Sequence, residues 1–153
     1  MREVAPTSAE SAQGLLVAAS QMFAREPALS SILSIDLSRI RSEAELLASV
    51  LSGAMAAASS RTIVHETALA VFDKDETARS FALADIRTTA RKNFEPGGEL
   101  TTLLFSRGVH ALLGHRVTHS LWAEKRRQEP ISPGFALLLE TSRWTRRISV
   151  AIH

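Results

Sequence analysis

Three histidines and one arginine fall close together in the second half of the chain, at His110, His115, Arg116 and His119. His115 and His119 are four residues apart, so a helix would place both imidazoles on one face, where they could bind a transition metal. His110 is five residues from His115 and would point elsewhere on the same helix. No third ligand is evident, so the spacing favours hydrogen-bonded or interface histidines, and we expect no metal site.

Serine is plentiful, but its context does not favour nucleophilic catalysis. The chain has no Gly-x-Ser-x-Gly motif, which would hold a nucleophilic serine on a sharp turn. Pro96-Gly97-Gly98 lacks the Gly-x-x-x-x-Gly-Lys spacing of a phosphate-binding loop and indicates a turn. We therefore expect no independent hydrolase site.

Basic residues gather in two places near the C-terminus, Lys125-Arg126-Arg127 and residues 143–147, where Trp144 adds one aromatic ring. Such a region could bind nucleic acid through phosphates. Acidic neighbours, Glu124 and Glu129 among them, dilute the charge. We favour solvated helix ends and expect no nucleic-acid partner, but a diverged helical module that binds protein or nucleic acid stays open as the alternative function.

Length and composition favour one helical domain with a real core. The chain has 153 residues, is 45% hydrophobic and has a net charge of +2. Seven glycines and five prolines are too few for a chain built of strands and turns, and Ala and Leu, which favour helix, are abundant. The predicted fold class is therefore all-α.

The absence of cysteine excludes disulfides and thiolate metal sites and fits a reducing, cytoplasmic compartment. The N-terminal sequence has no apolar core of signal-peptide length. No run of about 18 apolar residues is present, so we expect no membrane span.

Capping motifs and apolar periodicity predict about six to eight helices. In the first half of the chain we expect a helix from the Thr7-x-x-Glu10 box to Arg25, one from Pro27 to Arg39, one from the Ser42-x-x-Glu45 box through Met55, one over Thr62–Phe72, and one capped by Asp73 and running through Ala90. A loop over Asn93–Gly98, a short helix over Glu99–Phe105 and a long helix over Gly108–Arg127 should follow. The expected end of the chain is a loop over Glu129–Gly134, a last helix over Phe135–Arg147 and the beginning of a strand at Ile148. The side chains expected to point inward include Ile32, Ile63, Phe81 and Leu112.

The long helix carries a distinctive run, Gly108-x-His110-Ala111-Leu112-x-x-x-Arg116-x-x-His119-x-Leu121-Trp122. This run resembles a segment of the serine acetyltransferases, which lies late in their helical N-terminal domain. Further resemblances to the family are Glu26-Pro27-Ala28-Leu29, Asp85-Ile86 and Val150-Ala151-Ile152-His153. In the family the last of these opens a left-handed β-helix of hexapeptide repeats. The resemblance implies a helical domain over residues 1–147 and, over 148–153, a stub that leads to a β-helix domain missing from this chain.

Members of the family transfer acetyl from acetyl-CoA to the hydroxyl of L-serine, a step of cysteine biosynthesis. Their helical domain joins trimers into hexamers, which implies a homo-oligomer here. The catalytic histidine and the acetyl-CoA cleft of the family would lie beyond His153, so the resemblance implies no catalytic residue and no cofactor in this chain. The resemblance therefore implies an assembly domain without independent activity, which meets L-serine only in a full-length context and leaves open whether the chain is itself an enzyme.

Two positions depart from the family pattern. Asn93 stands where the family has an aspartate that helps to bind the amino acid substrate, and a neutral amide pairs less strongly with an ammonium group. Ala151 stands where the family has an aspartate that orients the catalytic histidine. Asn93 is the one substrate-binding residue that the resemblance implies for this chain.

Overall fold

The computed structural model describes residues 8–125, with side chains from Gly14 onward. Its elements are α1 (Ser8–Arg25), α2 (Ala28–Leu33), the 3-10 helix η1 (Leu37–Arg39), α3 (Glu43–Met55), α4 (Arg61–Lys74), α5 (Glu76–Lys92), α6 (Gly98–Phe105) and α7 (Arg107–Lys125). This part of the chain contains helices and no strand, so the all-α prediction is confirmed. Two sets of predictions lie outside the described residues: the Thr7 cap, and the features predicted over 129–153, which include Ala151.

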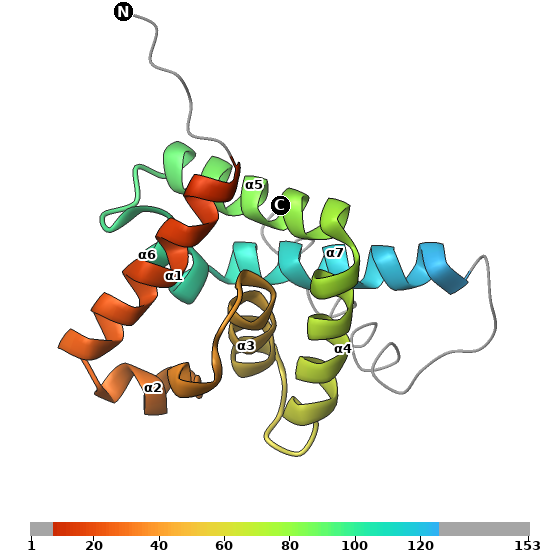
Figure 1. The fold of residues 1–153 in the computed structure, drawn as a ribbon, viewed down its shortest axis with the longest axis horizontal. Helices are drawn as coiled ribbons and strands as arrows, with labels where there is room; N and C mark the ends of the chain where they lie inside the picture. The colour runs from red at the N-terminus through yellow and green to blue at the C-terminus, as the bar shows by residue number, and fades with distance from the viewer. Residues whose placement is uncertain (1–7, 126–153) are drawn as a thin grey trace, which may run out of the picture.

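The helices pack in two groups around one core (Figure 1). The green α5 and the blue-green α7 run side by side in opposite directions. Below them α3 and α4 form a helical hairpin, which is the most extensive helix pairing in the described residues. The N-terminal helices α1 and α2 pack on α3, and the short α6 connects α5 to α7.

The core is centred on α3, where Leu46, Leu47 and Leu51 have almost no exposed surface. Phe72 of α4 and Leu113 of α7 are fully buried against the same cluster. Each such side chain contributes about 1.5–3 kcal/mol through removal of apolar surface from water. The core therefore fixes α7, the helix that carries the histidines, against the α3–α4 hairpin.

Local sequence determines where α3 begins. The hydroxyl of Ser42 accepts a hydrogen bond from the backbone N–H of Glu45 at 3.2 Å, and the Glu45 carboxylate accepts one from the N–H of Ser42 at 3.0 Å. These reciprocal bonds are a capping box, which satisfies two backbone donors that the first helical turn leaves free. The capping box predicted at these two residues is confirmed.

The helix predicted from Pro27 to Arg39 begins as expected, with Pro27 as the N-cap of α2, but its predicted end is wrong, because α2 ends at Leu33. Ser34 has a left-handed backbone with φ 56°, and the chain re-forms only one turn of 3-10 helix beyond it. The break lies where α2 meets α3: a Cβ on Gly53 would stand 2.5 Å from the carbonyl oxygen of Leu33. This close approach is a long-range contact, which local periodicity does not show.

The predicted cap at Asp73 is also wrong. Asp73 belongs to α4, which continues to Lys74, and Asp75 is the N-cap of α5. The carboxylate of Asp75 accepts a hydrogen bond from the N–H of Ala78 at 3.0 Å. The exposed residues Asp73 and Lys74 continue α4 past the position that the motif indicated.

Four large apolar side chains expected to point inward are exposed: Ile32 (72%), Phe81 (52%), Ile63 (40%) and Leu112 (36%). Their neighbours on the same helices, such as Val64, Ala82 and Leu113, are buried as expected. Periodicity locates an apolar stripe on a helix but does not determine how much of its width other helices cover.

No helix in the described part of the chain is long and apolar enough to span a membrane.

Candidate functional site

The substrate-loop candidate is the loop over residues 93–98, which carries Asn93, the expected substrate-binding residue. It lies between α5 and α6. Asn93 is the C-cap of α5, and its backbone N–H donates to the carbonyl oxygen of Thr89 at 3.0 Å. Its side chain is exposed. Phe94 follows with φ 49° and is 90% exposed, and Gly97 has φ 89°, a backbone conformation that favours glycine. The loop therefore presents an amide and an aromatic ring to solvent.

An ion pair joins the two helices that flank this loop. Arg87 Nε of α5 lies 3.4 Å from Glu99 Oε1 at the start of α6. Both side chains are half-buried. Because the pair spans the loop, it limits the separation of the end of α5 from the start of α6, and Asn93 lies between these two points.

A two-pronged ion pair joins α5 to α7. Arg116 donates from Nε to Asp85 Oδ2 at 2.8 Å and from Nη2 to Asp85 Oδ1 at 3.1 Å. The guanidinium carbon also lies 5.0 Å from the centre of the Phe81 ring. The hydrogen bonds that Arg116 donates to the Asp85 carboxylate raise the pKa of Arg116 above its ordinary value. The structure thus brings together two residues of the family resemblance that are 31 positions apart.

The sequence contained both residues but no signal that they meet. Arg116 belongs to the run from Gly108 to Trp122, and Asp85 belongs to the Asp85-Ile86 dipeptide. Opposite charges on two separate amphipathic helices are common, so the charges alone do not predict that Asp85 and Arg116 pair. The pair forms because of the way α5 packs on α7.

A second polar contact between the same helices was also missed. The hydroxyl of Ser120 near the end of α7 donates to Asp75 Oδ2 at 2.6 Å. This bond and the one from the N–H of Ala78 lower the pKa of Asp75. Asp75 therefore caps α5 and ties it to α7 at the end opposite the 93–98 loop.

His110 is a buried structural residue. Only 7% of its surface is exposed, and its Nε2 donates to the carbonyl oxygen of Leu103 in α6 at 2.7 Å. Burial lowers the pKa of His110, which favours the neutral ring. An imidazole whose Nε2 proton is held by a backbone carbonyl is not placed to act as a general base on a substrate.

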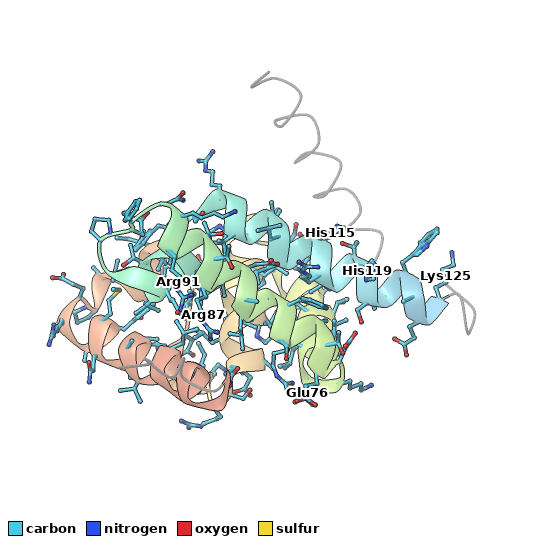
Figure 2. All side chains as sticks on the ribbon, turned by 90° about the horizontal axis from the view of Figure 1, so that it is seen from above. Glu76, Arg87, Arg91, His115, His119 and Lys125 are labelled. Atoms are coloured by element: carbon cyan, nitrogen blue, oxygen red, sulfur yellow. The ribbon has the colours of Figure 1, made fainter. Side chains whose placement is uncertain are left out.

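His115 and His119 lie on an exposed part of α7 (Figure 2), with ring centres 6.1 Å apart and planes inclined by 44°. The helix thus brings the two rings to one side, as their spacing indicates. Among the described residues no group of three or more His, Cys, Asp or Glu side chains could hold a metal ion. That a metal is not bound by this protein remains a prediction.

The basic region is only partly described. Lys125 ends α7, and its Nζ lies 5.8 Å from the centre of the Trp122 ring, a cation–π contact. Arg126, Arg127 and residues 143–147 lie outside the described residues. Of the basic residues in this region, Lys125 alone lies within the described part of the chain.

The fold and these contacts define an all-helical domain whose long last described helix is held by polar contacts to α5 and α6. The family model described as "Serine acetyltransferase, N-terminal" matches residues 13–113, which is more than half of the chain. The chain therefore belongs to the serine acetyltransferase N-terminal family, and the resemblance found in the sequence is confirmed. No curated protein and no solved structure matches the chain.

The matched region runs from α1 into α7 and includes Asp85, Asn93 and His110. The matched region ends before Arg116 and His119, so the likeness of these two positions to the family rests on the sequence resemblance alone. Asn93 lies in an exposed loop of the matched region, and its role in substrate binding stays a prediction.

Proposed function

We propose that this chain is the assembly domain of a serine O-acetyltransferase, which transfers acetyl from acetyl-CoA to the hydroxyl of L-serine in the cytoplasm. The observation that carries the proposal is the family match over residues 13–113, on a fold that is helical throughout the described residues. In this proposal the helical domain forms a homo-oligomer, and the loop over residues 93–98 approaches the serine substrate.

Exposed apolar side chains support self-association. Phe81 on α5 and Trp122 on α7 are each about half exposed, and Leu112 lies on the same long helix as Trp122. Large apolar groups on a helical surface favour contact with another protein surface, because association removes them from water. A second copy of the chain is the partner that the family relationship suggests.

The described histidines support the proposal that the chain alone lacks acetyltransferase activity. His110 is buried and bound to a backbone carbonyl, while His115 and His119 are exposed on α7. His65 Nε2 lies 3.3 Å from the hydroxyl of Ser49, but in the described part of the chain no carboxylate bonds to His65 to orient it. None of these rings forms the base and orienting acid that acyl transfer uses.

Multi-angle light scattering of the purified chain over a range of concentrations tests the assembly role. We expect a mass above that of the monomer that rises with concentration. Phe81→Ser should weaken association, whereas Thr77→Ser, one turn away on α5, should not. A monomeric mass at the highest concentration would contradict the assembly role.

Release of free CoA from acetyl-CoA and L-serine tests the activity of the chain alone. We expect release no faster than the buffer blank. Faster release, together with O-acetylserine identified by mass spectrometry, would show that these 153 residues carry the reaction themselves.

The role of Asn93 requires a fusion to a β-helix domain that has its own catalytic histidine. An aspartate at position 93 would offer the substrate ammonium an ion pair that the amide does not. Asn93→Asp should therefore lower the Michaelis constant for L-serine by roughly tenfold, the equivalent of one charge-assisted hydrogen bond. An unchanged Michaelis constant would show that position 93 does not contact serine.

A further inference from the structure

A hollow of about 690 Å³ lies between α3, α4 and the segment that follows α2. We call it the α3–α4 hollow; Figure 1 shows the two helices as a hairpin, joined by a short loop. Ser49 of α3, Arg61 and His65 of α4, and Arg39 of η1 are among its lining residues. None of the residues of the 93–98 loop lines it, so it is separate from the substrate-loop candidate.

Arg61 carries a buried donor with no partner. Its Nε is buried and makes no hydrogen bond, and in the part of the chain described by the structure its guanidinium forms no ion pair. The other guanidinium nitrogens of Arg61 make no hydrogen bond within the described residues either, and they are not buried. A partly buried guanidinium without an acceptor is costly, so a ligand oxygen that reaches these nitrogens from the hollow would be favoured.

The carboxylates that line the hollow do not supply this acceptor. Asp36 Oδ1 accepts from the backbone N–H of Ser38 at 3.0 Å and from its hydroxyl at 2.6 Å. Glu45 is held in the capping box of α3, and Glu66 is exposed. The guanidinium of Arg61 is thus left for a group from outside the protein.

Other donors lie around the same space. The hydroxyl of Ser49 and the ring of His65 are 3.3 Å apart across the α3–α4 pairing. Ser60, the N-cap of α4, donates its hydroxyl to the carbonyl oxygen of Ala57 and does not cap the helix. The backbone N–H groups of the first turn of α4 therefore keep their attraction for an anion, in addition to the charge of Arg61.

We infer that the α3–α4 hollow binds a small oxyanion, a carboxylate or a phosphate, through Arg61 with help from Ser49 and His65. The volume exceeds what a bare ion needs and falls within the usual range of small-molecule sites. The anion is therefore expected to be the charged group of a metabolite-sized molecule. This inference does not depend on the acetyltransferase proposal.

Amide NMR titration of the 153-residue chain with inorganic phosphate, and separately with sodium citrate, tests the site at constant ionic strength. We expect saturable shifts in α3 and α4 with at least one of the two, and the stronger binder identifies the anion class. Arg61→Gln should weaken binding by about tenfold or more, since it removes a charged hydrogen bond. Arg61→Lys keeps the charge without the planar fork and should fall between Arg61→Gln and the parent.

Arg107→Gln is the matched control, because Arg107 is an exposed arginine on α7 outside the hollow. It should bind as the parent does, and circular dichroism should show equal helix content in all variants. Three outcomes would overturn the inference: no saturable shift at roughly 10 mM of either probe, unchanged binding in Arg61→Gln, or an equal loss in Arg107→Gln. The first is the result expected if solvent alone satisfies the accessible nitrogens of the Arg61 guanidinium.

Discussion

Arg116 of α7 holds the carboxylate of Asp85 of α5 with two parallel hydrogen bonds, from Nε at 2.8 Å and from Nη2 at 3.1 Å. About a quarter of each side chain is exposed (28% and 20%), so the pair is screened less than a surface ion pair. It joins the antiparallel helices α5 and α7 near their middle. Geometry of this kind depends on the planar guanidinium, which lysine lacks.

A double-mutant cycle on Asp85→Ala and Arg116→Ala should give a coupling free energy of about 1 kcal/mol, as expected for a partly buried ion pair. Arg116→Lys should lose most of this coupling, because one ammonium cannot make both bonds. Urea unfolding followed by circular dichroism measures all of these variants. Additive effects of the two alanine substitutions would show that the pair does not stabilise the packing of α5 on α7.

Burial of His110 makes stability depend on pH. The pKa of His110 is lowered in the fold, so between its ordinary value near 6.5 and the lowered value the unfolded chain binds a proton that the folded chain does not. The free energy of unfolding should therefore fall as the pH falls through this window, by up to about 1.4 kcal/mol per pH unit.

His110→Gln separates this effect from other titrations, since its amide can still donate to the carbonyl oxygen of Leu103 but does not titrate. Urea unfolding at several pH values should show a weaker pH dependence for His110→Gln than for the parent below pH 6.5. Equal pH dependence in the two proteins would show that His110 is protonated to the same extent in the folded and unfolded states.

Asp75 caps α5 and accepts from Ser120, so its removal should cost about 1–2 kcal/mol, at the upper end of N-cap substitutions. Asp73→Ala is the matched control, because Asp73 is exposed within α4 and should change stability by less than about 0.5 kcal/mol. Thermal unfolding of Asp75→Ala and Asp73→Ala compares the two positions. If Asp73→Ala is the more harmful change, the cap assignment is wrong.

Gly53 and Gly14 should respond in opposite directions to alanine. A Cβ at position 53 would collide with the backbone carbonyl of Leu33, so Gly53→Ala should destabilise the fold by about 1–3 kcal/mol. Nothing lies within 4 Å of a Cβ at position 14, so Gly14→Ala should stabilise α1 by about 0.5–1 kcal/mol. A rise in melting temperature for Gly53→Ala would show that α2 does not need its close contact with α3.

Several features could be predicted from the sequence because their causes are local. The capping box at Ser42 and Glu45 lies within four residues, and the turn at Gly97 depends on a residue type that tolerates positive φ. The run from Gly108 to Trp122 predicted the family, and the match over residues 13–113 confirms that relationship. Composition alone indicated the all-α class.

Tertiary structure decided the features that depend on how helices meet. At its end, α2 approaches Gly53 of α3 closely, and Asp75, the cap of α5, also accepts a hydrogen bond from Ser120 of α7. The partner of Arg116 lies 31 residues away along the chain. Capping rules and periodicity act within a few residues, whereas these contacts depend on the relative position of whole helices, which packing of the apolar core fixes.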